Sequence, residues 1–347
     1  MNENNDFIQL PPLKKDTSSD VVAFIWEYMK LQENSTAPFK SGTKIINETD
    51  ADVKYQIECD TANAVMHNYH LFPGIDLSYT TFSANYCFQR NASMHNVIEI
   101  AYCSAGRYEC EYKRGYMTYL GEGDFAVSVL DSQREMPYFP TSYYDGLAII
   151  VDTDLAGMNY ESGIEGISIN FKDLVQKYCV NHCCTVMKAT TILRHVFNEM
   201  LEMREKINIG YLRLKVLEVF YHISNTLPNQ STEISAYYSG DTIKKIKLIK
   251  DDLMENYNKK CSLQDYAEKY DLRMTTMKEC FKAVYGKPIY SFQREYKMQM
   301  AAKLLATTSS SITEVAGKIG YENPNKFSTA FKEVIGTTPR EYRKKNN

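Results

Sequence analysis

Ser311-Ile312-Thr313-Glu314-Val315-Ala316 repeats a pattern that the chain has already used 49 residues earlier, at Ser262-Leu263-Gln264-Asp265-Tyr266-Ala267. In each copy a serine opens an apolar run and an acidic residue follows three positions later, which indicates a capping box at the start of a helix. A second amphipathic segment then contains Phe281 or Phe331, and it ends at a glycine with a proline close behind. The repeat predicts two helix-turn-helix units, in which the second helix reads the DNA major groove.

Small residues mark the places where each unit must be tight. Ala267 and Ala316 stand where two helices approach closely, and Gly320 supplies the positive φ that a sharp turn requires. The first copy has Asp271 at the matching position, a residue that tolerates this conformation less well. Between the copies, residues 290–306 predict one long helix that would hold the two units apart.

Charge is divided unevenly along the chain. The whole sequence carries a formal net charge of −3, but residues 241–347 hold 21 Lys and Arg against 13 Asp and Glu, a net charge of +8. Residues 1–240 carry −11. This division of charge is expected when a basic domain binds a polyanion and an acidic domain does not bind it. A solvated helical surface would give the same net charges.

The bulk composition limits the class of protein. A length of 347 residues is enough for two domains, and no apolar run approaches the roughly 20 residues that a membrane span needs. Met1 to Asp6 is polar and acidic, so we expect no signal peptide. The nine cysteines then indicate reduced thiols rather than a disulfide framework. We therefore expect a cytoplasmic protein with no membrane segment.

The spacing of apolar residues along the chain predicts an α+β fold. Residues 53–165 contain short alternating runs such as Ile75 to Phe82, which predict an antiparallel β sandwich or barrel. Apolar residues at three and four spacing predict helices in residues 166–228. The polar residues 229–240 indicate a linker to the helical domain at 241–347. Residues 1–52 form an extension with one short helix expected at Val21 to Leu31.

Two apolar stripes mark the helical segment. The helix expected at 191–207 carries the first stripe and the helix expected at 211–227 carries the second. The stripes consist of Leu193, Val196, Phe197, Met200 and Leu201, and of Leu214, Leu217, Phe220 and Tyr221. Either they cover the β domain or they form the seam of a dimer, and the sequence leaves both interpretations open.

The C-terminal motifs are long enough to suggest a family. They are Lys297-Met298-x-x-Ala301-x-x-Leu304-Leu305, Ile312-x-x-Val315-Ala316-x-x-Ile319-Gly320-Tyr321, Phe327-Ser328-x-x-Phe331-Lys332 and Gly336-x-x-Pro339-x-x-Tyr342-Arg343. Together they resemble the signature of AraC/XylS-type transcriptional regulators. Residues 320–327 and, more weakly, 98–109 further resemble the subgroup typified by the pyochelin-responsive regulator.

The resemblance implies that the second helix of each unit lies in the major groove of double-stranded DNA, and that the protein contacts RNA polymerase. The positions implied to face DNA are Met274, Thr275, Lys278, Glu279 and Lys282 in the first unit, and Asn325, Lys326, Thr329 and Lys332 in the second. Helical spacing agrees, because residues 275, 278 and 279 share a face opposite Phe281, and residues 325, 326 and 329 share a face opposite Phe331.

Three residues depart from the family pattern. The family often has Arg where this chain has Glu279 and Thr329, so base specificity cannot be carried over. A glutamate would accept a hydrogen bond from cytosine N4 or repel phosphate. Arg273 stands where the family usually has a serine N-cap, so we expect the first reading helix to start imperfectly.

For the N-terminal half the resemblance implies a cupin-like domain that binds a small effector, followed by helices that make a homodimer. Aromatic side chains with a few polar groups suit a planar or sugar-like ligand, although they are also ordinary strand core. The candidates are Tyr79, Phe82, Arg90, Tyr102, Arg107 and Tyr112. His67 and His70 lack the His-x-His spacing of metallo-cupins, so we expect them at the surface or in a loop. We expect no metal, no cofactor and no enzyme activity.

Two alternatives stay open. One attaches a thiol- or metal-responsive sensor, or an alkyl-acceptor protein, to the same DNA-binding unit. Its candidates are Cys179, His182, Cys183 and Cys184, with Cys179 and Cys183 on one helix face, although buried structural thiols explain them as well. The other alternative gives the β domain a dimerising role alone.

Overall fold

The computed structural model describes residues 42–49, 52–59, 62–83, 96–112, 115–129, 138–163, 167–179, 184–225, 236–259 and 261–346. It confirms an antiparallel β domain in the N-terminal half and a helical domain at the C-terminus. The cupin-like assignment stays a prediction. The sheet already begins at Gly42, inside the segment that we expected to be an extension. The helix expected at residues 21–31 lies outside the described residues.

Ten of the strands that the structure describes form one antiparallel sheet. Its main path runs β1-β2-β3-β4-β8-β5-β6-β12, while β7 pairs with β5 and with β11. The ten strands are β1 (Gly42–Glu48), β2 (Asp52–Cys59), β3 (Ala62–Phe72), β4 (Ile75–Ser83), β5 (Val97–Tyr112), β6 (Tyr116–Gly121), β7 (Asp124–Val129), β8 (Tyr144–Asp152), β11 (Thr185–Lys188) and β12 (Tyr238–Ser239). A separate pair, β9 (Asn159–Glu161) and β10 (Ser168–Asn170), follows the short helix α2 (Thr153–Ala156).

The strand β5 changes partners along its 16 residues. One edge of β5 pairs with β8 from Val97 to Gly106, while the opposite edge pairs with β7 from Ile98 to Tyr102 and then with β6 from Arg107 to Tyr112. Gly106 has a φ of 81°, and a Cβ there would lie 2.0 Å from the carbonyl oxygen of Tyr143. A side chain is therefore excluded at this point, next to the register shift between Cys103 and Ala105. The change of partner carries the β5–β6 hairpin toward the C-terminal domain.

Both faces of the sheet are buried. One face carries Tyr79 and Ile100 and packs against α4 (Thr191–Glu202) and α5 (Ile209–Asn225). The other face carries Cys103 and Tyr144. The alternation of side chains along each strand places one set of residues on each face, as the period-two runs of the sequence predict.

The predicted helical stripes are mostly core. Leu193, Val196, Phe197 and Met200 of α4 are at most 1% exposed, so this stripe covers the sheet. In α5, Phe220 is buried, but Leu214 is 59% exposed and Tyr221 is 48% exposed. These two residues lie two turns apart on one side of α5. We call them the outer strip.

Residues 166–228 are less helical than predicted. They contain the strands β10 and β11, and β11 pairs with β7 at the edge of the sheet. The first helix of eight residues in this segment is α3 (Phe171–Tyr178), which ends with Cys179 as its C-cap. Cys179 therefore lies at the end of a helix and not on a helix face, so the expectation that it shares a face with Cys183 was wrong for Cys179. Cys183 lies outside the described residues. Helical spacing misled us because a short apolar strand fits the same pattern.

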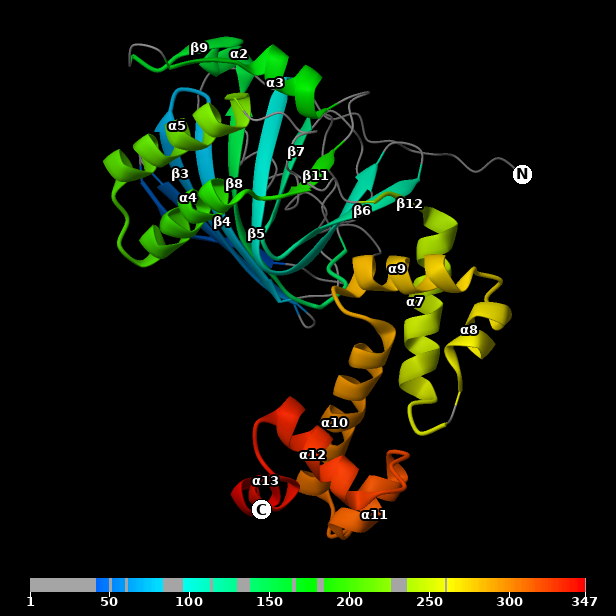
Figure 1. Cartoon of the computed structure of the whole chain (residues 1–347). Helices are drawn as coiled ribbons and strands as arrows, with labels where there is room; N and C mark the ends of the chain where they lie inside the picture. Colours follow the sequence, from blue (N-terminus) through cyan, green and yellow to red (C-terminus); the bar gives the residue numbers. More distant parts are fainter. Residues whose placement is uncertain are drawn as a thin grey trace, which may run out of the picture.

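The C-terminal domain has two small cores. Its helices are α7 (Gly240–Glu255), α8 (Leu263–Lys269), α9 (Met274–Tyr285), α10 (Ile289–Thr307), α11 (Ile312–Lys318), α12 (Pro324–Ile335) and α13 (Pro339–Asn346). Phe281 anchors the first core and Phe331 the second, and both side chains are fully buried. The long helix predicted between the copies is α10, which enters the first core at Ile289 and the second at Met298. Figure 1 shows the second unit at the far end of α10, away from the sheet.

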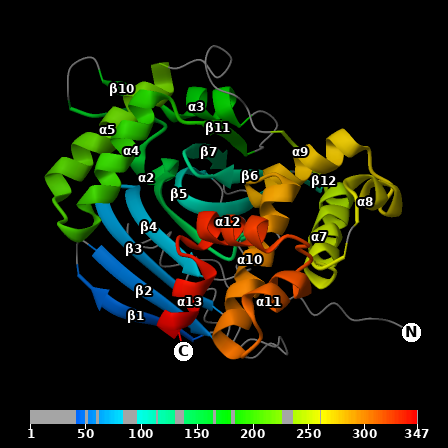
Figure 2. The same ribbon diagram turned by 60° about the horizontal axis from the view of Figure 1, so that its bottom comes forward.

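The first helix-turn-helix unit packs against the β5–β6 hairpin. The predicted linker ends in β12, which pairs with β6, and Tyr119 of β6 enters the first helical core. The Glu109 carboxylate accepts hydrogen bonds from the Tyr119 hydroxyl at 2.5 Å and from Lys247 Nζ at 3.0 Å. Arg107 Nε donates to the carbonyl oxygen of Ala283 in α9 at 2.7 Å. Figures 1 and 2 show α7 and α9 beside β6 and β12 in both views.

Among the described residues, no helix combines the length and the apolar character that crossing a membrane requires.

Candidate nucleic-acid interface

Both units open with the capping boxes that the sequence predicts. Ser262 Oγ accepts from the backbone N–H of Asp265 at 3.2 Å, and the Asp265 carboxylate accepts from the N–H of Ser262 at 2.8 Å. Ser311 and Glu314 make the same reciprocal pair at 3.1 and 2.6 Å. Each box satisfies two N–H groups that lack partners inside the helix, so α8 and α11 start at defined residues.

The turn of each unit uses a left-handed residue, as expected. Asp271 has a φ of 48° and Gly320 a φ of 83°. At Gly320 space is short as well, because a Cβ would lie 3.0 Å from the carbonyl oxygen of Asn258. The Asp271 side chain is exposed, so the energetic cost of its left-handed conformation lies in the backbone and not in crowding of the side chain.

The two reading helices, α9 and α12, begin differently. Asn323 caps α12, because its Oδ1 accepts from the N–H groups of Asn325 at 2.9 Å and Lys326 at 3.3 Å. Arg273 makes no side-chain cap bond to α9, which confirms the expected imperfect start. The helix forms nonetheless, because its apolar side is buried and Gly286 closes its end in the left-handed conformation.

Each reading helix buries one side and exposes the other. Eight of the nine predicted DNA-facing residues are exposed: Thr275, Lys278, Glu279 and Lys282 on α9, and Asn325, Lys326, Thr329 and Lys332 on α12. Met274 is half-buried and packs on the first core. The four lysines of these faces make no side-chain hydrogen bond or ion pair with the described part of the chain. Their ammonium groups are thus available for an external anion.

The helix α10 sets the distance between the two units. Its 19 residues span about 28 Å at a rise of about 1.5 Å per residue. Its N-terminal end packs in the first core and its C-terminal half packs in the second, so one continuous helix joins both units. Arg294 of α10 forms an ion pair with Glu333 of α12, which fastens the second reading helix to this spacer.

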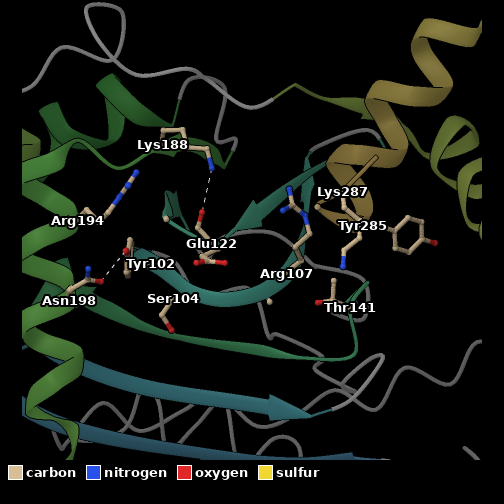
Figure 3. A pocket seen from close by; sticks show the side chains of 13 residues that line it. Tyr102, Ser104, Arg107, Glu122, Thr141, Lys188, Arg194, Asn198, Tyr285 and Lys287 are labelled. Atoms are coloured by element: carbon tan, nitrogen blue, oxygen red, sulfur yellow. Dashed lines mark hydrogen bonds between the residues drawn. The ribbon is translucent and has the colours of Figure 1, made fainter. Parts of the chain in front are cut away.

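The residues predicted to bind an effector do not form one cluster. Tyr79 donates to the carbonyl oxygen of Met200 beneath α4, at 2.5 Å, whereas Phe82 stacks on Phe139 at the opposite face of the sheet. Tyr112 ends β5, and Arg90 lies outside the described residues. The structure does bring Tyr102 and Arg107 together, because both line a pocket between the two domains (Figure 3).

The remaining walls of that pocket were not predicted from the sequence. They include Lys188, Arg194 and Asn198 of the N-terminal domain, and Lys287 just after α9. No sequence signal links these residues, because they belong to separate elements that only the domain contact brings together.

The two histidines lie within β3 and are half-buried, so the expectation of a surface or loop position was wrong. His67 Nε2 is 2.6 Å from Asp52 Oδ2, and His70 Nδ1 is 2.7 Å from Asp76 Oδ1. A carboxylate partner offsets the cost of burying each ring, which is why a strand can hold it. The described residues contain no group of three His, Cys, Asp or Glu that could hold a metal ion.

Most of the described cysteines are buried. Cys103, Cys110, Cys179, Cys184 and Cys280 are inside the protein, and Cys261 is exposed. Burial raises the pKa of the Cys103 and Cys280 thiols to about 12. Both therefore stay protonated at neutral pH and are poor nucleophiles. This placement favours structural thiols over a thiol-responsive sensor.

Comparison with known proteins gives the class of the C-terminal domain. Residues 266–345 match the helix-turn-helix domain family. The chain is 23% identical over 189 residues to the raffinose operon transcriptional regulatory protein of Pediococcus pentosaceus, covering 54% of this chain and 65% of that protein. It is 28% identical over 114 residues to the HTH-type transcriptional activator RhaR of Mannheimia succiniciproducens, covering 33% of this chain and 40% of that protein.

A solved structure is similar as well. The C-terminal domain of the two-component response regulator yesN from Fusobacterium nucleatum is 31% identical, with a TM-score of 0.27 over 30% of this chain and 98% of that one. The family match identifies residues 266–345, which contain both α9 and α12, as a helix-turn-helix domain. It is of the type that AraC/XylS-type regulators carry. The chain spans between 40% and 65% of the lengths of the two curated relatives named here.

Proposed function

We propose that this chain is a sequence-specific, DNA-binding transcription regulator of the AraC type. In this proposal α9 and α12 enter two successive major grooves on one side of double-stranded DNA. The observation that carries the proposal is the pair of exposed faces on α9 and α12. Each face has two lysines that make no hydrogen bond or ion pair with the described residues, and α10 joins the two units.

The position of each residue along its helix suggests its role. Lys278 and Lys326 lie in the N-terminal halves of α9 and α12, where recognition helices contact base edges, and a lysine there suits guanine O6 and N7. Asn325 suits adenine, and Glu279 suits cytosine N4. Lys282 and Lys332 come later in their helices and suit phosphates, which position the protein without reading sequence.

The contact between the domains is compatible with this function. Arg107 and Tyr119 of the hairpin pack on the side of α9 that carries Cys280 and Ala283. Lys278 and Glu279 remain exposed in the whole chain. The described N-terminal residues therefore leave these two side chains of the α9 face uncovered.

We also propose that the β domain responds to a small effector, that the outer strip of α5 makes a homodimer, and that the DNA-bound protein contacts RNA polymerase. The similarity to a raffinose operon regulator and to an activator supports a role in operon control. The assignment to the subgroup typified by the pyochelin-responsive regulator rests on residues 320–327 and 98–109 of the sequence.

Selection of bound fragments from a random DNA pool by the full-length protein tests the proposal. We expect one site with two half-elements about one helical turn apart. Lys278→Ala and Lys326→Ala should each relax the base preference in a different half-element, at a cost of about 1–3 kcal/mol. The control is Lys303→Ala, which removes an exposed lysine of α10 and should keep both preferences. If Lys278→Ala and Lys326→Ala weaken all sequences equally, the lysines contact phosphate and the assigned reading faces are wrong.

A further inference from the structure

The pocket between the domains has the size and position of a ligand site. Its volume is about 700 Å³, which is enough for a small metabolite. Residues of β5, of the β6–β7 turn and of α4 form one wall, and residues 285–287 at the C-terminal end of α9 form another. Figure 3 shows Arg194 and Asn198 on one side of the space, with Arg107 and Lys287 on the other. A molecule bound here would contact the sensor half and the DNA-binding half at once.

The charge of the lining is mostly positive. Arg107, Lys188, Arg194 and Lys287 line the pocket together with one carboxylate, that of Glu122. Two of the four cations have carboxylate partners: Lys188 Nζ lies 2.5 Å from Asp124 Oδ1, and Lys287 pairs with Glu295.

The two arginines lack such partners. Within the described residues, the Arg194 guanidinium makes no hydrogen bond or ion pair. Arg107 uses its Nε for the carbonyl oxygen of Ala283 and has no ion pair with a described carboxylate. Burial lowers the pKa of Arg107, and the Asp124 carboxylate opposes this effect without forming an ion pair, so a bound anion would further offset the cost of burying the charge.

The neutral groups of the lining can hydrogen-bond a polar body. Tyr102 donates its hydroxyl proton to Asn198 Oδ1 at 3.2 Å. This bond uses only the oxygen of the Asn198 amide, so the amide N–H groups can donate to a ligand. Ser104 and Thr141 add hydroxyl oxygens to the same lining. Ser104 donates its proton to Asp145 and Thr141 donates to the carbonyl oxygen of Tyr143, so each offers a ligand an acceptor oxygen. Such a lining matches a ligand that carries several hydroxyl groups better than it matches an apolar one.

We propose that this pocket binds a small polyhydroxylated anion, in which a phosphate or carboxylate meets Arg194 and Arg107 and the hydroxyl groups meet Asn198, Ser104 and Thr141. The proposal rests on the proposed function, because it names the chemistry of the effector. A ligand in this position stabilises whichever arrangement of the domains completes the pocket. It therefore changes DNA affinity, and DNA changes the affinity for the ligand by the same factor.

Calorimetric titration of the full-length protein tests the proposal. The probes are glucose 6-phosphate and glucuronate, with glucose as their neutral counterpart and orthophosphate as the bare anion. We expect at least one of the two charged sugars to bind at least about tenfold more tightly than both glucose and orthophosphate. The phosphate and carboxylate arms show which anion the arginines select.

Variants locate the binding. Arg194 is exposed on α4, so Arg194→Gln should fold and should weaken the binding of the charged sugar at least about tenfold. Lys206→Gln removes an exposed charge outside the pocket and should leave binding unchanged. Three results would overturn the proposal. They are equally tight binding of glucose or orthophosphate, no binding of either charged sugar, and undiminished binding of the charged sugar by Arg194→Gln.

Measurement of DNA affinity without ligand separates the two proposals. Arg194 lies outside both reading faces, so Arg194→Gln should bind DNA like the wild type in the absence of sugar, and only the wild type should respond to the charged sugar. If all proteins fail to bind DNA while the titration succeeds, the proposed function fails and the pocket stands. If DNA binding is intact and the titration fails, this inference alone is wrong.

Discussion

At the scale of single residues, the two turns show the same backbone demand met in two ways. Gly320 adopts a φ of 83° without strain, whereas Asp271 adopts 48° with a side chain in place. The neighbouring Gly317 lies inside α11, and a Cβ added to it would have no neighbouring atom within 4 Å, so a side chain there meets no obstacle. Two glycines three residues apart therefore have opposite requirements.

We expect Gly320→Ala to lower the free energy of unfolding by about 1–2 kcal/mol, because it forces a Cβ into the left-handed region and toward Asn258. The matched change Gly317→Ala should raise it by about 0.5–1 kcal/mol, because alanine favours the helix. Urea denaturation followed by circular dichroism measures both. A gain in stability from Gly320→Ala would contradict the role given to this turn.

At the scale of elements, the two reading helices differ in how they begin. The α12 helix has the Asn323 cap and a proline in its first turn, whereas α9 begins at Arg273 without a side-chain cap. Packing compensates for the missing cap, because Met277, Cys280 and Phe281 are fully buried. The first reading helix is thus held by its apolar side more than by its end.

We expect Arg273→Ser to stabilise the protein by about 1 kcal/mol, because a serine oxygen can accept from the free N–H groups of the first turn. Asn323→Ala should destabilise it by a similar amount, about 1 kcal/mol, because it removes an existing cap. Thermal unfolding of the two variants, compared with the wild type, should therefore shift in opposite directions. Shifts in the same direction would mean that the cap is not what distinguishes the two helices.

The outer strip of α5 is an element-scale feature with a different consequence. Leu214 is 59% exposed and Tyr221 48% exposed on a helix whose other apolar residues are mostly core. We expect Leu214→Glu to give a folded monomer with weaker DNA binding, because a dimer holds two reading domains at a raised effective concentration. Ser224→Glu, also exposed on α5, is the control and should stay dimeric.

Light scattering at micromolar concentration decides this prediction. A monomeric wild type would end the dimer proposal. Loss of folding in Leu214→Glu would instead show that the side chain supports the core despite its exposure.

At the scale of the whole molecule, the β5–β6 hairpin packs the N-terminal β domain against the helix-turn-helix domain. Glu109 is central to it, because its carboxylate meets Tyr119 and Lys247, and the Lys247 ammonium also lies 3.7 Å from the centre of the Tyr138 ring. Burial, with the Glu109 charge adding to it, raises the pKa of Tyr138 to about 12, so the ring stays neutral beneath the ammonium at neutral pH. The domain contact thus depends on a charged pair that is only partly exposed.

We expect Glu109→Gln to loosen this contact, because a neutral amide leaves the Lys247 charge without its partner. Amide hydrogen exchange should then become faster in β12 and α9, and unchanged in α4. Glu218→Gln is the control, because its partner Lys215 belongs to the N-terminal domain. Unchanged exchange in β12 and α9 of Glu109→Gln would show that strand pairing alone holds the domains together.

The sequence by itself determined the C-terminal domain. Capping boxes, turn residues and apolar spacing act within a few residues of one another, so Ser262, Gly320 and Phe331 could be assigned before any fold was known. It also determined the alternating strands. The sequence could not show whether the apolar stripe at Leu193 packs in the core or at a dimer interface, because that depends on the surface opposite the helix. The structure shows that the stripe packs against the sheet.

Only the tertiary structure decided where an effector could bind. Tyr102 and Arg107 were candidates for their chemistry alone, among four others that proved to lie elsewhere or outside the described residues. Arg194 and Lys287 could not be predicted as pocket residues, because no motif near them in the sequence indicates a binding site. They meet at one space because one edge of β5 changes its partner from β7 to β6 between Tyr102 and Arg107, and the β5–β6 hairpin then packs against α9. Local patterns fix elements, but a site between domains depends on contacts between residues far apart in the chain.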